Sequence, residues 1–93
     1  MNNDTLQAKA LVKLIKLYGM DYMKSKICSA WVVRCDMGDY MRFSFCFELG
    51  DERPDLQADY KGWAVWATLD VDRETGEVKV IECVLPDGSR VTE

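Results

Sequence analysis

The first part of the chain carries apolar side chains at helical spacing. They follow the series i, i+3, i+4 and i+7 in Leu11, Leu14, Ile15, Tyr18 and Tyr22. This pattern predicts an amphipathic helix with one buried face. Asp4 suits the N-cap position, and Gln7 three residues later completes a capping box. The helix is expected to end either at Gly19, as a left-handed cap, or near Lys24, because the apolar pattern continues beyond the glycine.

A β-hairpin is predicted next, because two segments with alternating apolar residues flank the turn sequence Asp36-Met37-Gly38. A three-residue loop there would pair Cys35 with Asp39. In this register one face collects the large apolar side chains Trp31, Val33, Met41, Phe43, Phe45 and Phe47. A shift by one residue would bring Arg34 onto that face, so the first register is preferred and the row is expected to lie in the core. The opposite face then holds Cys28, Ala30, Val32, Arg34, Tyr40, Arg42, Ser44 and Cys46.

A second hairpin is predicted over residues 63–72 and 77–85, with Arg73-Glu74-Thr75-Gly76 as its loop. Glycine suits the last loop position, where a positive φ is needed. The paired apolar residues are then Val71 and Val78, Leu69 and Val80, and Val65 and Val84. On the other face Asp70 opposes Lys79, and Trp66 opposes Cys83 beside Ile81. Residues 90–92 form either an edge piece or a tail.

Residues 62–78 read GWAVWATLDVDRETGEV and end in a Val-Asp-x-x-Thr-Gly-x-Val turn. This stretch resembles the closing hairpin of PepSY-type domains, and it is also similar to the last hairpin of small cystatin-like folds. The resemblance covers these residues only. It implies a helix gripped by an antiparallel sheet and a role in inhibiting or regulating peptidases. It carries over no active-site residue.

The predicted elements form one α+β domain over residues 1–93, with the cystatin-like order α-β-β-β-β. A chain of 93 residues is long enough for one hydrophobic core and too short for two. The N-terminal helix would pack on one face of a four-stranded antiparallel sheet made of the two hairpins. The other face would place Tyr40, Trp66 and Ile81 among Arg34 and Arg42. A half-apolar face of this kind marks a protein contact or a dimer interface, unless residues 50–62 cover it.

Charge divides the chain in two. Residues 1–35 carry six basic and two acidic side chains, a net charge of +4, whereas residues 36–93 carry six basic and fourteen acidic ones, a net charge of −8. Lys9, Lys13 and Lys16 share one stripe of the helix and are expected to face water. The long connection 50–62 is acidic through Asp51, Glu52, Asp55 and Asp59. The overall balance of −4 argues against a nucleic-acid binder. The basic helix face and the acidic connection are either simply solvated, or the acidic surface engages a basic partner.

The chain offers little for catalysis or metal binding. It has no histidine, which is the commonest general base and metal ligand. Its four cysteines stand apart rather than in Cys-x-x-Cys pairs, so reduced, buried thiols are expected. Cys28 and Cys46 would oppose each other in the preferred register, which leaves a thiol-based redox or metal function as an alternative. No enzymatic activity, cofactor or metal is predicted.

The N-terminal residues Met1-Asn2-Asn3-Asp4 lack a basic region leading into a long apolar run, so neither a secretory signal nor a transit peptide is recognised. The longest nearly uncharged stretch, residues 27–33, is too short to cross a bilayer. A cytoplasmic protein is therefore expected.

The leading hypothesis is a small protein-binding module that inhibits or regulates its partner by occlusion. Its contacts would come from the acidic connection and the exposed sheet face, through Asp51, Glu52, Asp55, Asp59, Arg34, Tyr40, Arg42, Trp66 and Ile81. One form of this hypothesis is a phage-type inhibitor that blocks the basic cleft of a nucleic-acid enzyme. The alternative is a homodimer that serves structure or small-ligand binding through the sheet face around Trp66. Direct binding to nucleic acid or to a membrane is not expected.

Overall fold

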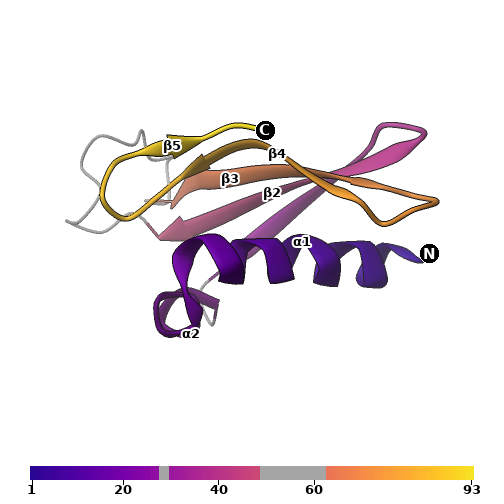
Figure 1. Cartoon of the computed structure of the whole chain (residues 1–93). Helices are drawn as coiled ribbons and strands as arrows, with labels where there is room; N and C mark the ends of the chain where they lie inside the picture. Colours follow the sequence, from indigo (N-terminus) through magenta and orange to yellow (C-terminus); the bar gives the residue numbers. More distant parts are fainter. Residues whose placement is uncertain (28–29, 49–62) are drawn as a thin grey trace.

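The computed structural model describes residues 1–27, 30–48 and 63–93 (Figure 1). Its helices and strands are α1 (Asn3–Tyr18), α2 (Met20–Ile27), β1 (Trp31–Asp36), β2 (Tyr40–Glu48), β3 (Trp63–Asp72), β4 (Val78–Val84) and β5 (Arg90–Val91). The strands form one antiparallel sheet in the order β1-β2-β3-β4-β5. Helix α1 lies along one face of this sheet (Figure 1). The α+β class is therefore confirmed, and the short strand β5 adds a fifth strand to the four that were expected.

Helix α1 begins two residues earlier than the capping pattern predicts. Its N-cap is Asn2, whose Oδ1 accepts a hydrogen bond from the N–H of Thr5 at 2.8 Å, so Asp4 lies inside the first turn. The helix ends at Gly19, which has φ +90° and donates its N–H to the carbonyl of Ile15 at 2.9 Å. The expected end at Gly19 is confirmed, but its ψ of 151° differs from the left-handed cap that was predicted. The apolar pattern beyond the glycine belongs to α2, which begins directly after it and keeps the chain helical to Ile27.

The buried face of α1 consists of residues four apart, namely Leu6, Ala10, Leu14 and Tyr18. Leu11 and Ile15, expected at its centre, are only half-buried at its margin. The sheet supplies the other half of the core through Met41, Phe43, Phe45, Phe47, Leu69, Val71 and Val80. Burying one such side chain completely stabilises the fold by about 1.5–3 kcal/mol.

The predicted register of the first hairpin is wrong. The structure pairs Trp31 with Cys46 and Asp36 with Met41, and the N–H of Met37 donates to the carbonyl of Tyr40 at 3.0 Å. The loop therefore has two central residues instead of three. Gly38, with φ +89°, occupies the first of them, where a type II′ turn needs glycine.

The new register exchanges the two faces of β1. Trp31 and Val33 lie on the face away from α1, and Val32 and Arg34 lie on the face toward it, opposite Phe45 and Phe43. Trp31 is therefore a surface residue with an exposed fraction of 50%, not part of the core.

Arg34 is tolerated on the helix side because β1 is the edge strand of the sheet. Its side chain stays exposed and reaches back to α1, where Nη2 lies 2.7 Å from Asp4 Oδ1 and Nε donates to Gln7 Oε1 at 2.7 Å. A long side chain on an edge strand can cover apolar surface with its stem and keep its charge in water. The charge that disfavoured this register is thus never buried.

The second hairpin follows its predicted register near the loop and departs from it further along. Val71 pairs with Val78, Leu69 with Val80 and Asp70 with Lys79, as predicted. The register then shifts by one residue, so that Thr68 pairs with Glu82 and Ala67 with Cys83. The extra residue in β4 is Ile81, which forms a β-bulge. The predicted pairs of Trp66 with Cys83 and of Val65 with Val84 are therefore wrong.

A second irregularity lies in β3, where Phe45 pairs with Ala67 but Cys46 pairs with Val65. Trp66 is therefore the extra residue of β3, with no residue of β2 directly opposite it. A bulged residue escapes the strict alternation of a strand, and Trp66 turns into the core, where it is 1% exposed. Its ring centroid lies 5.7 Å from that of Phe47 and 6.3 Å from that of Tyr22 in α2.

Candidate functional site

The side of the sheet away from α1, here called the open face, carries three large apolar side chains that are about half exposed. They are Trp31 on β1 at 50%, Val33 on β1 at 48% and Val65 on β3 at 52%. Isolated exposed hydrophobic residues are ordinary. Three on one sheet face form a feature that a folded domain does not need for its own stability.

The strand registers place these side chains in rows that run across the sheet. The first row joins Trp31, Cys46 and Val65, the second joins Val33, Ser44, Thr68 and Glu82, and the third joins Cys35, Arg42, Asp70 and Lys79. Opposed residues in antiparallel strands have Cβ atoms about 4.5–5.5 Å apart. The open face therefore begins with an apolar row, continues with a row of Val33, two hydroxyl groups and Glu82, and ends with a charged row.

The charged row is held in a fixed geometry. Arg42 Nε donates to Asp70 Oδ1 at 2.8 Å and Arg42 Nη2 donates to Asp70 Oδ2 at 3.0 Å, which is the bidentate arrangement of a strong ion pair. The hydrogen bond to Asp70 raises the pKa of Arg42. The guanidinium also lies 5.9 Å from the ring centroid of Tyr40, within cation–π range. Arg42 thus presents a planar, immobilised group to anything that lies on the open face.

The tips of the two hairpins are tied together beside this row. Arg73 Nη2 lies 2.7 Å from Asp36 Oδ1, and Arg73 Nε donates to the carbonyl of Gly38 at 2.7 Å. The N–H of Gly38 and the Arg73 guanidinium lower the pKa of Asp36. The carboxylate of Asp72 accepts the N–H groups of Thr75 and Glu74, which lower its pKa. These contacts fix the end of the sheet.

The structure brings together only some of the predicted contact residues. Tyr40 and Arg42 lie on the open face as expected. Arg34 lies on the helix side at the sheet edge, because the true register exchanges the faces of β1. Trp66 is buried at the bulge in β3, and Ile81 is half-buried at the bulge in β4. The expectation that Trp66 is exposed on this face is therefore wrong, and the homodimer expected around it stays a prediction.

Four predicted contact residues, Asp51, Glu52, Asp55 and Asp59, lie outside the described residues. Sequence reasoning missed Trp31, Val33 and Val65 as surface residues. The turn sequence held the information needed for the first two, because Gly38 followed by Asp39 also fits a two-residue loop.

The thiols give no support to a redox pair. Cys46 lies opposite Trp31 rather than Cys28, which itself lies outside the described part of the chain. Cys83 is buried, and burial raises its pKa to about 12, so its reactive thiolate form is suppressed. Cys35 is exposed on the open face. Among the described residues, no group of three or more cysteine or acidic side chains is placed to hold a metal ion.

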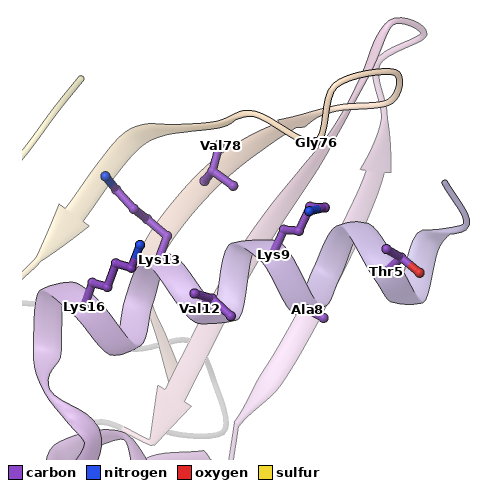
Figure 2. A pocket seen from close by; sticks show the side chains of 8 residues that line it. All are labelled: Thr5, Ala8, Lys9, Val12, Lys13, Lys16, Gly76 and Val78. Carbon is purple, nitrogen blue, oxygen red and sulfur yellow. The ribbon is translucent and has the colours of Figure 1, made fainter.

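A second feature is a hollow of about 500 Å³ between α1 and the β3–β4 hairpin (Figure 2). It is lined by Thr5, Ala8, Lys9, Val12, Lys13, Lys16, Gly76 and Val78. The lysine stripe that was expected to face water thus borders this hollow, with Lys9 and Lys13 half-buried. Lys13 is already paired, because its Nζ lies 2.8 Å from Glu93 Oε2.

Comparison with models of protein families, with curated proteins and with solved structures finds no match. The resemblance of residues 62–78 to the closing hairpin of PepSY-type domains therefore stays a prediction. Neither of the two described helices is long and apolar enough to span a membrane.

Proposed function

We propose that the protein is a non-enzymatic protein-binding module that contacts its partner through the open face of the sheet. The observation that carries this proposal is the cluster of Trp31, Val33 and Val65, each about half exposed, beside the fixed Arg42. Tryptophan, tyrosine and arginine dominate binding hot spots, and an apolar centre with a polar rim is the usual anatomy of a protein interface. The open face has this composition and this arrangement.

The shape of the face favours action by occlusion. Its side chains stand on adjacent strands whose registers are fixed, and Arg42 is held by Asp70 and Tyr40. A preorganised surface loses little conformational entropy on binding. A sheet face with fixed strand registers would bind by covering a partner's surface and would thereby inhibit or regulate that partner.

The acidic balance of residues 36–93 supports a partner with a basic surface, including the cleft of a nucleic-acid enzyme. Opposite charges raise the rate of association, and salt screens them. Affinity for such a partner is expected to fall between 50 mM and 500 mM salt, chiefly through slower association. Affinity that does not change over this range contradicts a basic partner but leaves an apolar contact through the open face intact.

The test of the open face compares two pairs of substitutions. In the first variant Trp31→Ala is combined with Val33→Ala, and in the control Val12→Ala is combined with Met20→Ala, which removes similarly exposed apolar side chains from the helices. Proteins captured from a lysate of the source cells are quantified for each chain. We expect the first variant to lose its specific partner by at least tenfold, about 1.4 kcal/mol, and the control to retain it. Equal capture by both variants contradicts the proposal.

A further inference from the structure

Strand β1 forms one edge of the sheet over six residues. The hydrogen bond from Met37 to Tyr40 fixes which residues of β1 bond to β2, because such pairs alternate along an antiparallel ladder. Val33 and Cys35 face β2 with their backbone groups. The N–H and C=O groups of Val32, Arg34 and Asp36 therefore point outward, and no described residue hydrogen-bonds to them.

Among the described residues, this edge has few of the devices that keep an edge strand from pairing. Natural edges carry proline, lysine, bulges, inward-pointing charges or a covering element, whereas β1 is regular, contains neither proline nor lysine, and has Arg34 as its one charge on the helix side. Its two charged side chains are held by their own chain, since Arg34 binds Asp4 and Asp36 binds Arg73. Because both charges are paired within the chain, neither repels a strand that approaches the outward backbone groups of β1.

We propose that β1 pairs with β1 of a second copy of this chain, antiparallel and across a two-fold axis at Val33, so that two sheets join into one. Outward-facing residues must oppose outward-facing residues, so paired residue numbers have an even sum. Pairing about Val33 sets Val32 against Arg34 of the second copy and Trp31 against Cys35 of the second copy. Pairing about Arg34 would oppose two arginines directly, which is destabilising.

A second copy fits this edge for two reasons. The charges of Arg34 and Asp36 cancel within β1, so two copies of the strand do not repel each other. The half-exposed side chains Trp31 and Val33, with Cys35, all lie on the open face. Pairing about the two-fold axis would therefore place these side chains of both copies next to one another on one continuous face, and would bury part of them between the copies. A two-fold interface of this kind closes on itself.

The inference does not depend on the proposed function. The dimer would leave the rest of the open face accessible on both copies, whereas a monomer could still bind a partner through that face. Oligomeric state is measured on the isolated chain and partner capture on variants. The failure of one proposal is therefore distinguishable from the failure of the other.

The first experiment measures molar mass by light scattering over a dilution series of the full chain. Arg34→Pro removes one outward N–H, which an edge strand tolerates, and blocks pairing, whereas the control Arg34→Ala keeps that N–H. We expect the wild type and Arg34→Ala to dimerise, and Arg34→Pro to raise the dimer dissociation constant at least tenfold while remaining folded by circular dichroism. A wild-type monomer at all concentrations overturns the proposal, and so does a dimer that Arg34→Pro leaves unchanged.

The second experiment tests the register by oxidation with diamide. In a background of Cys28→Ser and Cys35→Ser, Val33→Cys would place two thiols opposite each other across the axis. Their Cα atoms would be about 4.5 Å apart, within disulfide range. The control is Val65→Cys, which is equally exposed on the same face but lies on a central strand. We expect a covalent dimer only with Val33→Cys. Cross-linking of wild-type Cys35 instead would place the axis at Cys35 and overturn the register, and equal cross-linking at Val65→Cys would overturn the edge pairing.

Discussion

At the scale of single residues, Gly76 illustrates how a turn and a neighbouring helix can both require glycine at the same position. Its φ is +73°, and a Cβ there would lie 2.6 Å from Lys9 Cε in α1. Gly38 also has a positive φ, +89°, but a Cβ there would have no atom within 4 Å. The two glycines therefore separate the cost of the backbone conformation from the cost of crowding.

The first prediction uses this difference. Gly38→Ala is expected to lower the free energy of unfolding by about 1–3 kcal/mol, because the first central position of a type II′ turn has a positive φ that L residues rarely adopt. Gly76→Ala is expected to cost more, because the Lys9 side chain must also move away. Urea denaturation measures both free energies of unfolding. Adding Lys9→Ala should reduce the destabilisation by Gly76→Ala toward that by Gly38→Ala. Equal costs for the two glycines would contradict the close packing of Lys9 on the turn.

The second prediction concerns Asp72, whose pKa is lowered from 3.8 by hydrogen bonds from the backbone of Thr75 and Glu74. A carboxylate with a lower pKa in the folded state stabilises the fold above its unfolded pKa, and this contribution disappears as the pH falls through the folded pKa. Asp72→Asn should therefore destabilise the protein at pH 7, and its difference from the wild type should shrink below pH 3.8.

The pH dependence of Asp72→Asn is measured by urea denaturation at pH 7 and pH 3. Glu74→Gln is the matched control, because Glu74 contributes its backbone N–H to this turn. A gap between Asp72→Asn and the wild type that is the same at both pH values would mean that the charge of Asp72 has no role in the loop.

At the scale of elements, the two hairpins show what can be predicted from a sequence and what cannot. The β3–β4 loop ends in Gly76, and its four residues allow one register, so the pairs nearest the loop were predicted correctly. The turn at Gly38 fits a loop of two residues as well as one of three. The choice depends on whether Arg34 can face α1, which in turn depends on the edge position of β1.

The bulges could not have been predicted for a related reason. In a regular strand, every second side chain lies on the same face of the sheet. Nothing in the local sequence marks Trp66 or Ile81 as a residue that interrupts this alternation. The burial of Trp66 is decided by the space between α2 and Phe47, which exists only once the helices are docked. The candidate site inherits both errors, since Trp66 leaves the open face and Trp31 joins it.

The third prediction tests the burial of Trp66 against its exposed neighbour on the same strand. Trp66→Ala is expected to lower the free energy of unfolding by about 3–5 kcal/mol, because it opens a cavity between Tyr22 and Phe47. Val65→Ala should change it by less than about 0.5 kcal/mol, since Val65 is half exposed. Chemical denaturation followed by circular dichroism measures both. Similar costs for the two variants would contradict the bulge in β3.

At the scale of the whole molecule, α1 connects the two outer parts of the structure. Asp4 near its start binds Arg34 of the edge strand β1, and Lys13 further along binds Glu93. The backbone of Glu93 also bonds to the carbonyl of Val80 in β4. The helix is thus held at both sides by polar contacts as well as by the core beneath it, while β2 and β3 form the protected centre of the sheet.

The fourth prediction follows from this arrangement and is read by amide hydrogen exchange. Amides in β2 and β3 should exchange most slowly, because each of these strands is hydrogen-bonded along most of its length to a strand on both sides. Along β1 the rates should alternate in the dilute monomer, slow at Val33 and Cys35, whose N–H groups face β2, and fast at Val32 and Arg34. Uniform protection along β1 in a dilute monomer would contradict the register, whereas protection of Val32 and Arg34 that grows with concentration is expected from the dimer.

The bulge at Ile81 has a consequence for how the chain can change length during evolution. Deleting one residue from a regular strand turns every later side chain to the opposite face. In β4 the ladder already skips Ile81, because Leu69 pairs with Val80 and Thr68 with Glu82. A homologue that lacks the residue at position 81 would pair β3 with β4 without a bulge and would keep every other side chain of β4 on its present face. Strand β4 is therefore the place in the sheet where a gap in an alignment of relatives would be structurally silent.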